Sequence, residues 1–418
     1  MHRLPRSRRV LHVAVLLALI GIALLLLPLR AQLPGLPAMQ ASDVSVSGLS
    51  SGGYMAVQYG VAYSTSVKGA GVVAGGPYSC SRGSVDTATT LCSCTGLGMC
   101  RVSPGGTNVA ALAALTEQYA AARSIDPVSN LAGQRIWLFS GTADTVVPQA
   151  VMNDLHGYYR RFMGADNISY RKDVAAQHAM PTDSAGNACA SLGSPYINNC
   201  GVDAAGQLLQ WIYPGLAPRS ASAPAGRLLE FDQGQYLADP TAHGMAASGF
   251  LYIPPACDGG GSQGCKLHVA FHGCKQDARS IGDKFIRDTG YLRWADSNRI
   301  LVLFPQAAPV FPLANPNACW DWFNYDDANF ARKNGRQMAA VKAMADRLTG
   351  GGAAPPPPGD AVCFTASNPD HVLAGRAYER FFFAYAQGSG QSMGLNSLFV
   401  RTTLRRTAPS HFVVGSCP

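Results

Sequence analysis

The pattern of apolar and polar residues predicts eight strands between residues 40 and 350. Several of them, such as residues 135–140 and 300–305, are continuous apolar runs rather than alternating ones. Continuous apolar runs are typical of parallel strands that are covered on both faces of a sheet. The expected strands are residues 43–47, 67–74, 135–140, 168–172, 228–233, 249–253, 266–271 and 300–305.

Segments with a helical repeat lie between these strands, at residues 52–63, 111–123, 148–162 and 336–348. In the third segment Val151, Leu155, Tyr158 and Phe162 recur on one face, and Pro148 stands at the first turn. Strands that alternate with helices in this way predict a doubly wound, mostly parallel sheet. The chain is long enough for such a three-layer core.

The stretch GLSSGG, residues 48–53, lies where the first strand is expected to pass into a helix. It contains G-x-S-x-G, which in this context is the pattern of a nucleophile turn in α/β-hydrolases. Such a sharp turn crowds its neighbours, which must therefore be small. We interpret Ser50 as the nucleophile, and we expect the backbone N–H of Ser51 to bind a developing oxyanion. A glycine-rich turn that caps a helix is the alternative.

A serine hydroxyl needs a base, and the base needs an acid that orients it. Asp144 follows an apolar strand, at the edge where open α/β sheets place their sites; capping of the next helix is its alternative role. His178 lies in the loop after the next expected strand, so the chain order Ser50, Asp144, His178 is that of α/β-hydrolases. The rival histidines and acids are His156, His243, His371, His411, Asp173 and Asp183.

A second oxyanion donor is expected from a loop after an earlier strand, often with a His-Gly motif. The stretch LHVAFHGC, residues 267–274, has this motif but follows the three candidate residues in the chain. Segments 228–233 and 249–253 resemble the opening antiparallel pair of the fold, and the strand that leads to Ser50 should come after segment 300–305. Because that strand lies near the start instead, we infer a circularly permuted α/β-hydrolase, with the backbone N–H of Cys274 as the second donor.

The first 38 residues have the pattern of an export leader. Residues 1–9 carry four arginines and no acid, and residues 10–29 are almost wholly apolar. Cleavage after Ala31, cleavage after Ala38 and an uncleaved membrane anchor are the alternatives. The leader holds five arginines, which leaves +3 of the formal charge of +8 for the rest of the chain. This small excess indicates no nucleic-acid partner, and a cleaved leader leaves no stable membrane contact.

Four consecutive prolines lie within residues 351–362, which predicts a semi-rigid linker. The linker separates a catalytic domain, residues 39–350, from a small module, residues 363–418. Cys363 and Cys417 lie near the two ends of the module, and a bridge between them would stabilise a unit too small to rely on its core.

The twelve cysteines of an exported chain predict disulfide bonds. Cys189 with Cys200 and Cys257 with Cys265 are close pairs, although the sequence leaves the pairing open. The cysteines around Cys94 lack the paired spacing and the nearby histidine of a zinc site, so we expect no metal.

Five stretches together resemble one known family: GLSSGGYMA, GTADTVV, QHAMPTD, LHVAFHGC and NPNACWDWFNY. It is the family of permuted, single-domain extracellular polyhydroxybutyrate (PHB) depolymerases and their esterase relatives, and the similarity covers nearly all of residues 44–350. The resemblance implies Ser50, Asp144 and His178 as a catalytic triad, with Ser51 and Cys274 at the oxyanion. In this family tryptophans flank a crevice for the polyester.

The resemblance therefore implies that Trp320 or Trp322 lines such a crevice, and burial in the core is the alternative. The terminal module resembles the short substrate-binding domains of these depolymerases. It departs from them at residues 381–383, which are three phenylalanines. An exposed apolar strip would adsorb to a water-insoluble polyester, whereas Tyr378, Tyr385 and Phe399 could equally form the core of the module.

We expect a serine esterase that hydrolyses PHB or related short-chain-length polyhydroxyalkanoates through an acyl-enzyme intermediate, without a metal or organic cofactor. Its expected partner is the polyester surface or its oligomers, and we expect a secreted or periplasmic monomer. The same residues would also serve a feruloyl or acetyl-xylan esterase whose tail binds carbohydrate. Outside the enzymes, the alternative is a catalytically silent adhesion or binding protein.

Overall fold

The structure is a computed structural model that describes residues 33–96, 99–259, 262, 264–310, 314–351, 363–408 and 411–415. The apolar part of the expected leader, residues 352–362 of the linker and Cys417 lie outside these ranges. Among the described residues, no helix is both long and apolar enough to cross a membrane.

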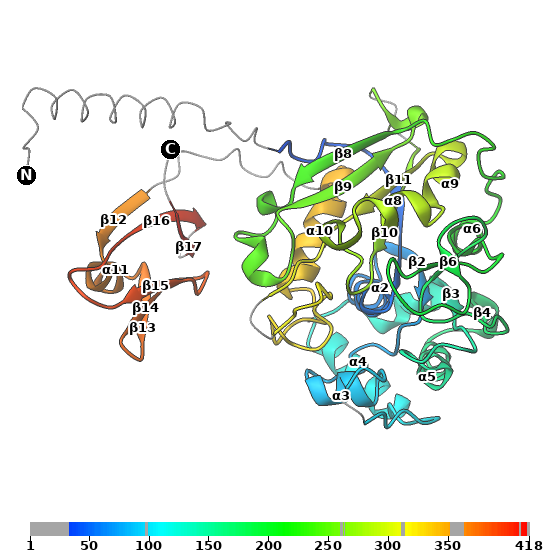
Figure 1. The fold of residues 1–418 in the computed structure, drawn as a ribbon, viewed down its shortest axis with the longest axis horizontal. Helices are drawn as coiled ribbons and strands as arrows, with labels where there is room; N and C mark the ends of the chain where they lie inside the picture. Colours follow the sequence, from blue (N-terminus) through cyan, green and yellow to red (C-terminus); the bar gives the residue numbers. More distant parts are fainter. Residues whose placement is uncertain are drawn as a thin grey trace, which may run out of the picture. The chain divides into compact units, whose positions relative to one another are not determined.

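The expected catalytic domain contains an eight-stranded sheet (Figure 1). Its strands are β1 (Ser42–Leu49), β2 (Val67–Val73), β3 (Arg135–Phe139), β4 (Ile168–Arg171), β8 (Arg227–Asp232), β9 (Ser248–Ile253), β10 (Lys266–Phe271) and β11 (Ile300–Phe304). Their order is β4-β3-β2-β1-β10-β11-β9-β8. Strand β9 pairs antiparallel with β8 and β11, and all other neighbours are parallel. Each of the eight expected strands is confirmed, and together they form this sheet.

Helices cover both faces of the sheet. They are α2 (Ser51–Ala62), α3 (Val85–Thr90), α4 (Val109–Ala121), α5 (Gln149–Tyr159), α6 (Ala204–Ile212), α7 (Ala278–Ile281), α8 (Lys284–Asp288), α9 (Tyr291–Asn298) and α10 (Arg336–Leu348). Residues of α2, α4, α5 and α10 pack into one core cluster, and residues of α6, α8 and α9 pack into a second. The four expected helices are confirmed as α2, α4, α5 and α10.

Short elements lie in the loops. They are β5 (Met180–Thr182), β6 (Asn187–Ala188), β7 (Ile197–Asn199), and the 3-10 helices η1 (Val128–Gly133), η2 (Ala165–Asn167), η3 (Gln233–Gln235), η4 (Pro240–His243) and η5 (Pro255–Cys257). Strands β5, β7 and β6 form a small separate sheet in the segment that follows His178.

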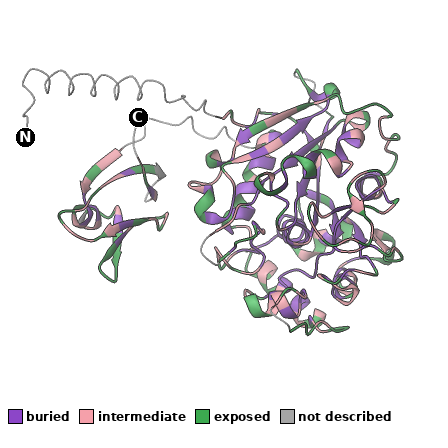
Figure 2. Ribbon diagram, in the orientation of Figure 1, coloured by how far each residue is buried: buried purple, intermediate pink, exposed green. Residues whose placement is uncertain are grey.

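The apolar strands at the centre of the domain are buried, and Figure 2 draws them in purple. In β3, Ile136 and Leu138 pack into one core cluster, while Trp137 and Phe139 pack into the other. Because successive side chains of a strand point to opposite faces, a strand between two helical layers needs apolar residues at every position. This explains the continuous apolar run of the sequence.

The two ends of the expected catalytic domain meet where an unpermuted chain would continue. The backbone N–H of Met39 donates to the carbonyl of Arg347 at 3.3 Å, and that of Ala41 donates to Leu348 at 3.0 Å. Helix α10 thus ends beside the residues that lead into β1. Read from β8 through β11 and then from β1 to β4, the chain follows the path of an α/β-hydrolase, and the fold is its circular permutation.

A buried polar group lies between the two central strands. The His268 ring of β10 lies 2.7 Å from the hydroxyl of Ser45 through Nδ1 and 2.7 Å from the hydroxyl of Ser47 through Nε2. The Ser47 oxygen also lies 2.7 Å from the Tyr291 hydroxyl. Burial lowers the pKa of His268 from 6.5 to about 3, because a charged ring would lose its hydration there.

The terminal module has two three-stranded sheets with the orders β12-β16-β17 and β13-β14-β15. Its elements are β12 (Cys363–Ser367), α11 (Asn368–Leu373), β13 (Ala377–Arg380), β14 (Phe383–Ala386), β15 (Ser392–Leu395), β16 (Arg401–Ala408) and β17 (His411–Val414). Its small core contains Ala384, Met393, Leu404 and Phe412.

Candidate active site

Ser50 lies at a strained turn between β1 and α2. Its backbone has φ 57° and ψ −124°, a combination that is costly for a residue with a Cβ atom and is typical of functional turns. The neighbouring glycines have no room for a side chain: a Cβ on Gly48 would lie 2.2 Å from the carbonyl oxygen of Gly52, and one on Gly52 would lie 2.2 Å from that of Phe271. This crowding is the physical reason for the small residues of GLSSGG.

Asp144 and His178 form a buried pair. Asp144 lies in the loop after β3, and its Oδ2 is 2.9 Å from Nδ1 of His178. Its other oxygen accepts the backbone N–H groups of Val146 and Val147, each at 2.8 Å. Because the carboxylate accepts, Nδ1 of His178 carries the proton and Nε2 is left as a base.

Gln177 joins the two loops that carry this pair. Its Oε1 accepts the backbone N–H groups of Thr145 and of His178, both at 2.9 Å. Its Nε2 donates to the hydroxyl of Thr145 at 3.1 Å. The sequence analysis did not identify Gln177, since no motif marks an amide that links two loops.

Ser50, Ser51, His178 and Cys274 line one cavity of about 350 Å³. The structure thus brings together residues from three separate parts of the chain. Among the hydrogen bonds of the described residues, none joins the Ser50 hydroxyl to the His178 ring. In unliganded enzymes such contacts are often loose and tighten when the substrate binds.

The backbone N–H groups of Ser51 and Cys274, both in the cavity lining with Ser50, have no acceptor among the described residues. In the loop after β10, Gly273 N–H donates to Oε1 of Gln276, Lys275 N–H to the carbonyl of Asn317 and Gln276 N–H to that of Gly273. Between these donors, the N–H of Cys274 has no acceptor among the described residues. The N–H of Ser51, in the first turn of α2, is the second such group. Unpaired N–H groups beside a nucleophile are suited to bind an oxyanion.

The His272 ring fixes the loop after β10 through two hydrogen bonds. Its Nε2 accepts the backbone N–H of Ala307 at 3.0 Å, so Nδ1 carries the proton and donates to the carbonyl of Gly273 at 2.7 Å. Burial lowers the pKa of His272, which keeps this neutral tautomer. The indole N–H of Trp320 donates to the His272 carbonyl at 3.0 Å.

The two expected tryptophans lie in different environments. Trp320 is fully buried in the core. For this residue the structure therefore shows burial in the core, which was the alternative to lining a crevice. Trp322 lines the cavity, and its ring stacks on that of Tyr54 with centroids 3.9 Å apart. Of the two candidates, only Trp322 can therefore touch a ligand in the cavity.

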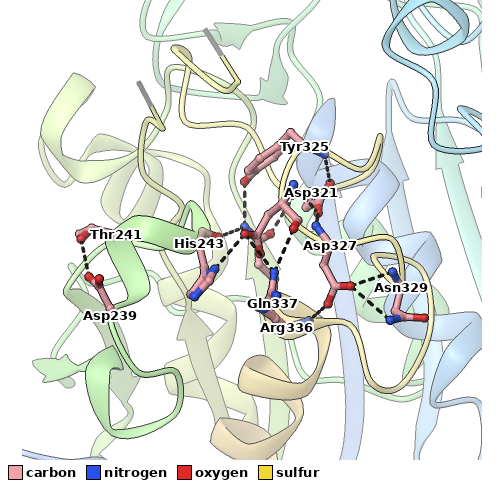
Figure 3. Close-up of polar contacts among 10 residues, drawn as sticks. Asp239, Thr241, His243, Asp321, Tyr325, Asp327, Asn329, Arg336 and Gln337 are labelled. Carbon is pink, nitrogen blue, oxygen red and sulfur yellow. Dashed lines mark hydrogen bonds and ion pairs between the residues drawn. The ribbon is translucent and has the colours of Figure 1, made fainter. Parts of the chain in front are cut away.

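The loop that carries Trp322 is held by buried polar contacts, which Figure 3 shows. The backbone N–H of Asp321 donates to Gln337 at 2.9 Å, and the Asp321 carboxylate accepts the N–H of Tyr325 at 3.1 Å. Nε2 of Gln337 donates to the Tyr325 hydroxyl and to the carbonyl of His243, both at 2.8 Å. Burial raises the pKa of Asp321 to about 6. The wall of the cavity is thus anchored to α10.

None of the rival histidines and acids at described positions lines this cavity. Nδ1 of His243 lies 2.8 Å from the carboxylate of Asp326, in a separate buried pair. Asp183 forms an ion pair with Arg219 at 2.7 Å. The structure therefore gives these groups no place in the cavity lining.

Five disulfides join described cysteines: Cys80–Cys92, Cys94–Cys100, Cys189–Cys200, Cys257–Cys265 and Cys274–Cys319. The two close pairs expected from the sequence are confirmed. The Cys274–Cys319 bridge ties the loop with the free N–H to the loop that carries Trp322. Cys363 is disulfide-bonded, and its expected partner Cys417 lies outside the described residues.

The terminal module exposes large apolar side chains. Phe399 is 96% exposed, so it is not part of the core, and Phe381, Phe382 and Leu398 are exposed as well. Small soluble domains rarely expose so many aromatic side chains unless the surface binds a partner.

The chain has close relatives among known proteins, although no protein-family model matches it. It is 40% identical over 481 aligned residues to a poly(3-hydroxybutyrate) depolymerase of Delftia acidovorans, which covers 92% of this chain and 94% of the relative. It is also 40% identical to a polyhydroxybutyrate depolymerase of Talaromyces funiculosus, over 76% of this chain and 93% of the relative.

Solved structures of PHB depolymerases are also similar to this chain. The crystal structure of a PHB depolymerase from Penicillium funiculosum is 38% identical, with a TM-score of 0.69, and covers 77% of this chain and all of that chain. A serine-to-alanine variant of a PHB depolymerase complexed with an R3HB trimer matches with a TM-score of 0.68, at the same identity and coverage.

The permuted sheet, the strained serine turn and the cavity at the edge of the parallel strands define an α/β-hydrolase, and within that class an ester hydrolase. The similarity to the relative from Delftia acidovorans over nearly the whole chain identifies the family within this class. The chain belongs to the PHB depolymerase family.

Proposed function

We propose that this chain is a serine esterase that hydrolyses the ester bonds of poly(3-hydroxybutyrate) or related short-chain-length polyhydroxyalkanoates. One observation carries the proposal: a strained serine, a buried His–Asp pair and two unpaired backbone N–H groups line a single cavity. The names of the relatives and the R3HB trimer bound to one of them support a polyester as the substrate class.

The reaction is acyl transfer in two steps. Nε2 of His178 accepts the proton of the Ser50 hydroxyl while Oγ bonds to the ester carbonyl carbon, and the N–H groups of Ser51 and Cys274 donate to the resulting oxyanion. The adduct collapses with cleavage of the C–O ester bond, and His178 returns the proton to the leaving hydroxyl. Water then repeats the sequence on the acyl-enzyme and releases a carboxylic acid. Asp144 holds His178 in the tautomer that both steps require.

The polyester chain enters along the wall that Trp322 forms. The cavity is mainly apolar, and the stacked rings of Trp322 and Tyr54 offer a flat surface to the methyl groups of the polymer. Phe323 and Leu192 extend this apolar wall. Such a wall favours a chain of alternating ester and methyl groups over a hydroxyl-rich polysaccharide.

The terminal module binds the surface of the polymer. Its exposed residues Phe381, Phe382 and Phe399 would lose contact with water on an apolar solid, which drives adsorption. The catalytic domain then acts on chain segments at that surface.

The protein acts outside the cytoplasm, in line with the five disulfides that join described cysteines. The compact unit that holds the sheet begins at Gly35, and Leu36 is buried in its core. Cleavage after Ala38 would remove Leu36, so we favour cleavage after Ala31. N-terminal sequencing of the exported protein tests this choice.

The activity is tested with purified protein, PHB granules and feruloylated arabinoxylan. We expect release of 3-hydroxybutyrate or its oligomers from the granules and no ferulate from the xylan, and we expect Ser50→Ala to abolish hydrolysis while the fold remains. Ser66→Ala, outside the cavity, is the control. A fluorophosphonate probe should label Ser50 in the wild type. Ferulate release without action on granules would make the chain a xylan esterase, and a chain without labelling and without hydrolysis would be a binding protein.

A further inference from the structure

Gln276 is a buried glutamine that connects two sides of the cavity. The residue is 1% exposed, although it belongs to a loop. Its Oε1 accepts the backbone N–H of Gly273 at 2.8 Å, and its Nε2 donates to the carbonyls of Pro195 and Tyr196 at 2.9 and 3.0 Å. Every strong hydrogen-bonding group of the amide except the second lone pair of Oε1 is therefore used.

The first of these bonds fixes the peptide next to the candidate oxyanion donor. Gly273 packs tightly against the nucleophile turn: a Cβ on it would lie 3.3 Å from Cβ of Ser50 and 2.9 Å from Oε1 of Gln276. With the N–H of Gly273 held by Gln276, the following N–H, that of Cys274, is the one left for the cavity. Loss of the Gln276 bond would free the Gly273 peptide to rotate and compete for that position.

The other two bonds reach the side of the cavity that carries the base. Tyr196 lines the cavity, and its carbonyl also accepts the backbone N–H of Met180 at 2.8 Å, two residues after His178. The carbonyl group of Tyr196 therefore links Gln276, in the loop of Cys274, to the segment that carries His178. These two segments lie far apart in the sequence.

We propose that Gln276 is a positioning residue, which keeps the Cys274 N–H directed at the developing oxyanion and holds that loop at a fixed place relative to His178. The inference rests on the proposed serine esterase activity. Its effect is specific to the transition state, because the oxyanion forms only there. A buried glutamine that only stabilises the fold would instead change stability and leave the kinetics alone.

A second buried glutamine, Gln134, serves as a matched control, because its loss should change stability without changing the kinetics. Gln134 is also 1% exposed, and its Nε2 also donates to two backbone carbonyls, those of Gly60 and Val67. It lies just before β3, away from the residues that line the cavity. Substitution of Gln134 therefore measures the cost of losing a buried amide of this kind without any effect on the site.

The experiment compares Gln276→Met, Gln276→Glu and Gln134→Met in the full chain. Glutamate keeps an acceptor for the Gly273 N–H but loses both donors, whereas methionine loses all three bonds. For each variant we would measure kcat and KM on a soluble 3-hydroxybutyrate oligomer, the thermal midpoint, and inhibition by a trifluoromethyl ketone. The ketone binds as a tetrahedral oxyanion on the serine, so its affinity reports on the oxyanion donors directly.

We expect Gln276→Met to lower kcat about 10- to 100-fold, which is less than the loss of about 100- to 1000-fold seen when an oxyanion donor is removed outright, with KM changed less than about twofold. The inhibition constant of the ketone should rise by a similar factor, with a smaller change in Gln276→Glu. Ketone affinity within about twofold of the wild type in Gln276→Met, or in Gln276→Glu if the methionine variant does not fold, would overturn the proposal. So would an equal kinetic loss in Gln134→Met. Absence of hydrolysis in the wild type would instead refute the esterase itself.

Discussion

Nδ1 of His178 lies 2.9 Å from Oδ2 of Asp144, and the other oxygen of that carboxylate is held by two backbone N–H groups. The acid is thus fixed on one side by its own loop and presents a single oxygen to the ring. This arrangement determines the tautomer of His178, because only an Nδ1–H can donate to the carboxylate. The orientation of the base is therefore set before any substrate arrives.

We predict that Asp144→Asn lowers kcat by about 10³- to 10⁴-fold, because an amide can favour the wrong tautomer and cannot stabilise the imidazolium. KM should change little, since Asp144 does not line the cavity. Kinetics on a soluble p-nitrophenyl ester, with circular dichroism as the check of the fold, measure the effect. A loss of less than tenfold would mean that another acid orients the ring.

The Cys274–Cys319 disulfide should matter for catalysis, and the Cys257–Cys265 disulfide should not. It joins residues 45 apart, so its loss in Cys274→Ser/Cys319→Ser should cost about 3 to 4 kcal/mol of stability. It should also lower kcat, because the loop with the Cys274 N–H loses its tie to the loop of Trp322. Cys257→Ser/Cys265→Ser is the control, since this bridge lies outside the cavity. Equal kcat values in the two double variants would contradict the prediction.

Trp322→Ala should weaken the binding of oligomers more than it slows the chemistry. The variant loses the ring that stacks on Tyr54 at the cavity wall, and aromatic surface of this kind contributes about 1 to 3 kcal/mol to binding. We expect KM for a 3-hydroxybutyrate trimer to rise about tenfold, with kcat on a small ester within about threefold. Trp211→Ala, at a half-buried site outside the cavity, should leave KM unchanged. A similar KM in both variants would remove Trp322 from the binding site.

Acid should destabilise the domain through His268. Burial lowers its pKa from 6.5 to about 3, so between these values the unfolded chain binds a proton that the folded protein does not. This contribution to stability is complete above pH 6.5 and is lost as the pH falls toward 3, at no more than about 1.4 kcal/mol per pH unit. In His268→Gln the free energy of unfolding should fall less steeply between pH 6.5 and pH 4. Urea titrations at several pH values measure it, and parallel slopes would contradict the assignment.

The fold was largely predictable because its local signals agree with its topology. All eight strands of the sheet carry apolar side chains on the buried faces, and the strand before GLSSGG identifies the nucleophile turn. Helices α3, α7 and α8 were missed because, at four to six residues, they complete too few turns to show a helical repeat. Helix α6 did carry a signal: Asp203 caps it, and Leu208, Leu209 and Ile212 face the core.

The candidate site was predictable only where a residue has a motif. Ser50 follows a strand directly, and Asp144 and His178 lie in loops that follow strands, and such positions can be recognised in a sequence. Gln177 and Gln276 could not be found in this way, because their roles depend on which backbone groups lie within 3 Å in the folded chain. The sequence also could not show which of Trp320 and Trp322 lies in the cavity, because both flank Asp321. Only the path of the loop places Trp320 in the core and Trp322 at the cavity.

The exposed aromatic residues of the module should control adsorption and nothing else. Phe381, Phe382 and Phe399 are each more than three-quarters exposed, so their replacement by serine removes no core contact. Burial of one such ring contributes about 1.5 to 3 kcal/mol, so the triple variant should partition onto PHB granules at least about 100-fold less well. Its kcat/KM on a soluble ester should equal that of the wild type. A granule-binding isotherm, run beside the soluble assay, measures both. Unchanged adsorption would mean that another surface of the chain holds the polymer, and a lower rate on the soluble ester would mean that these residues also support the catalytic domain.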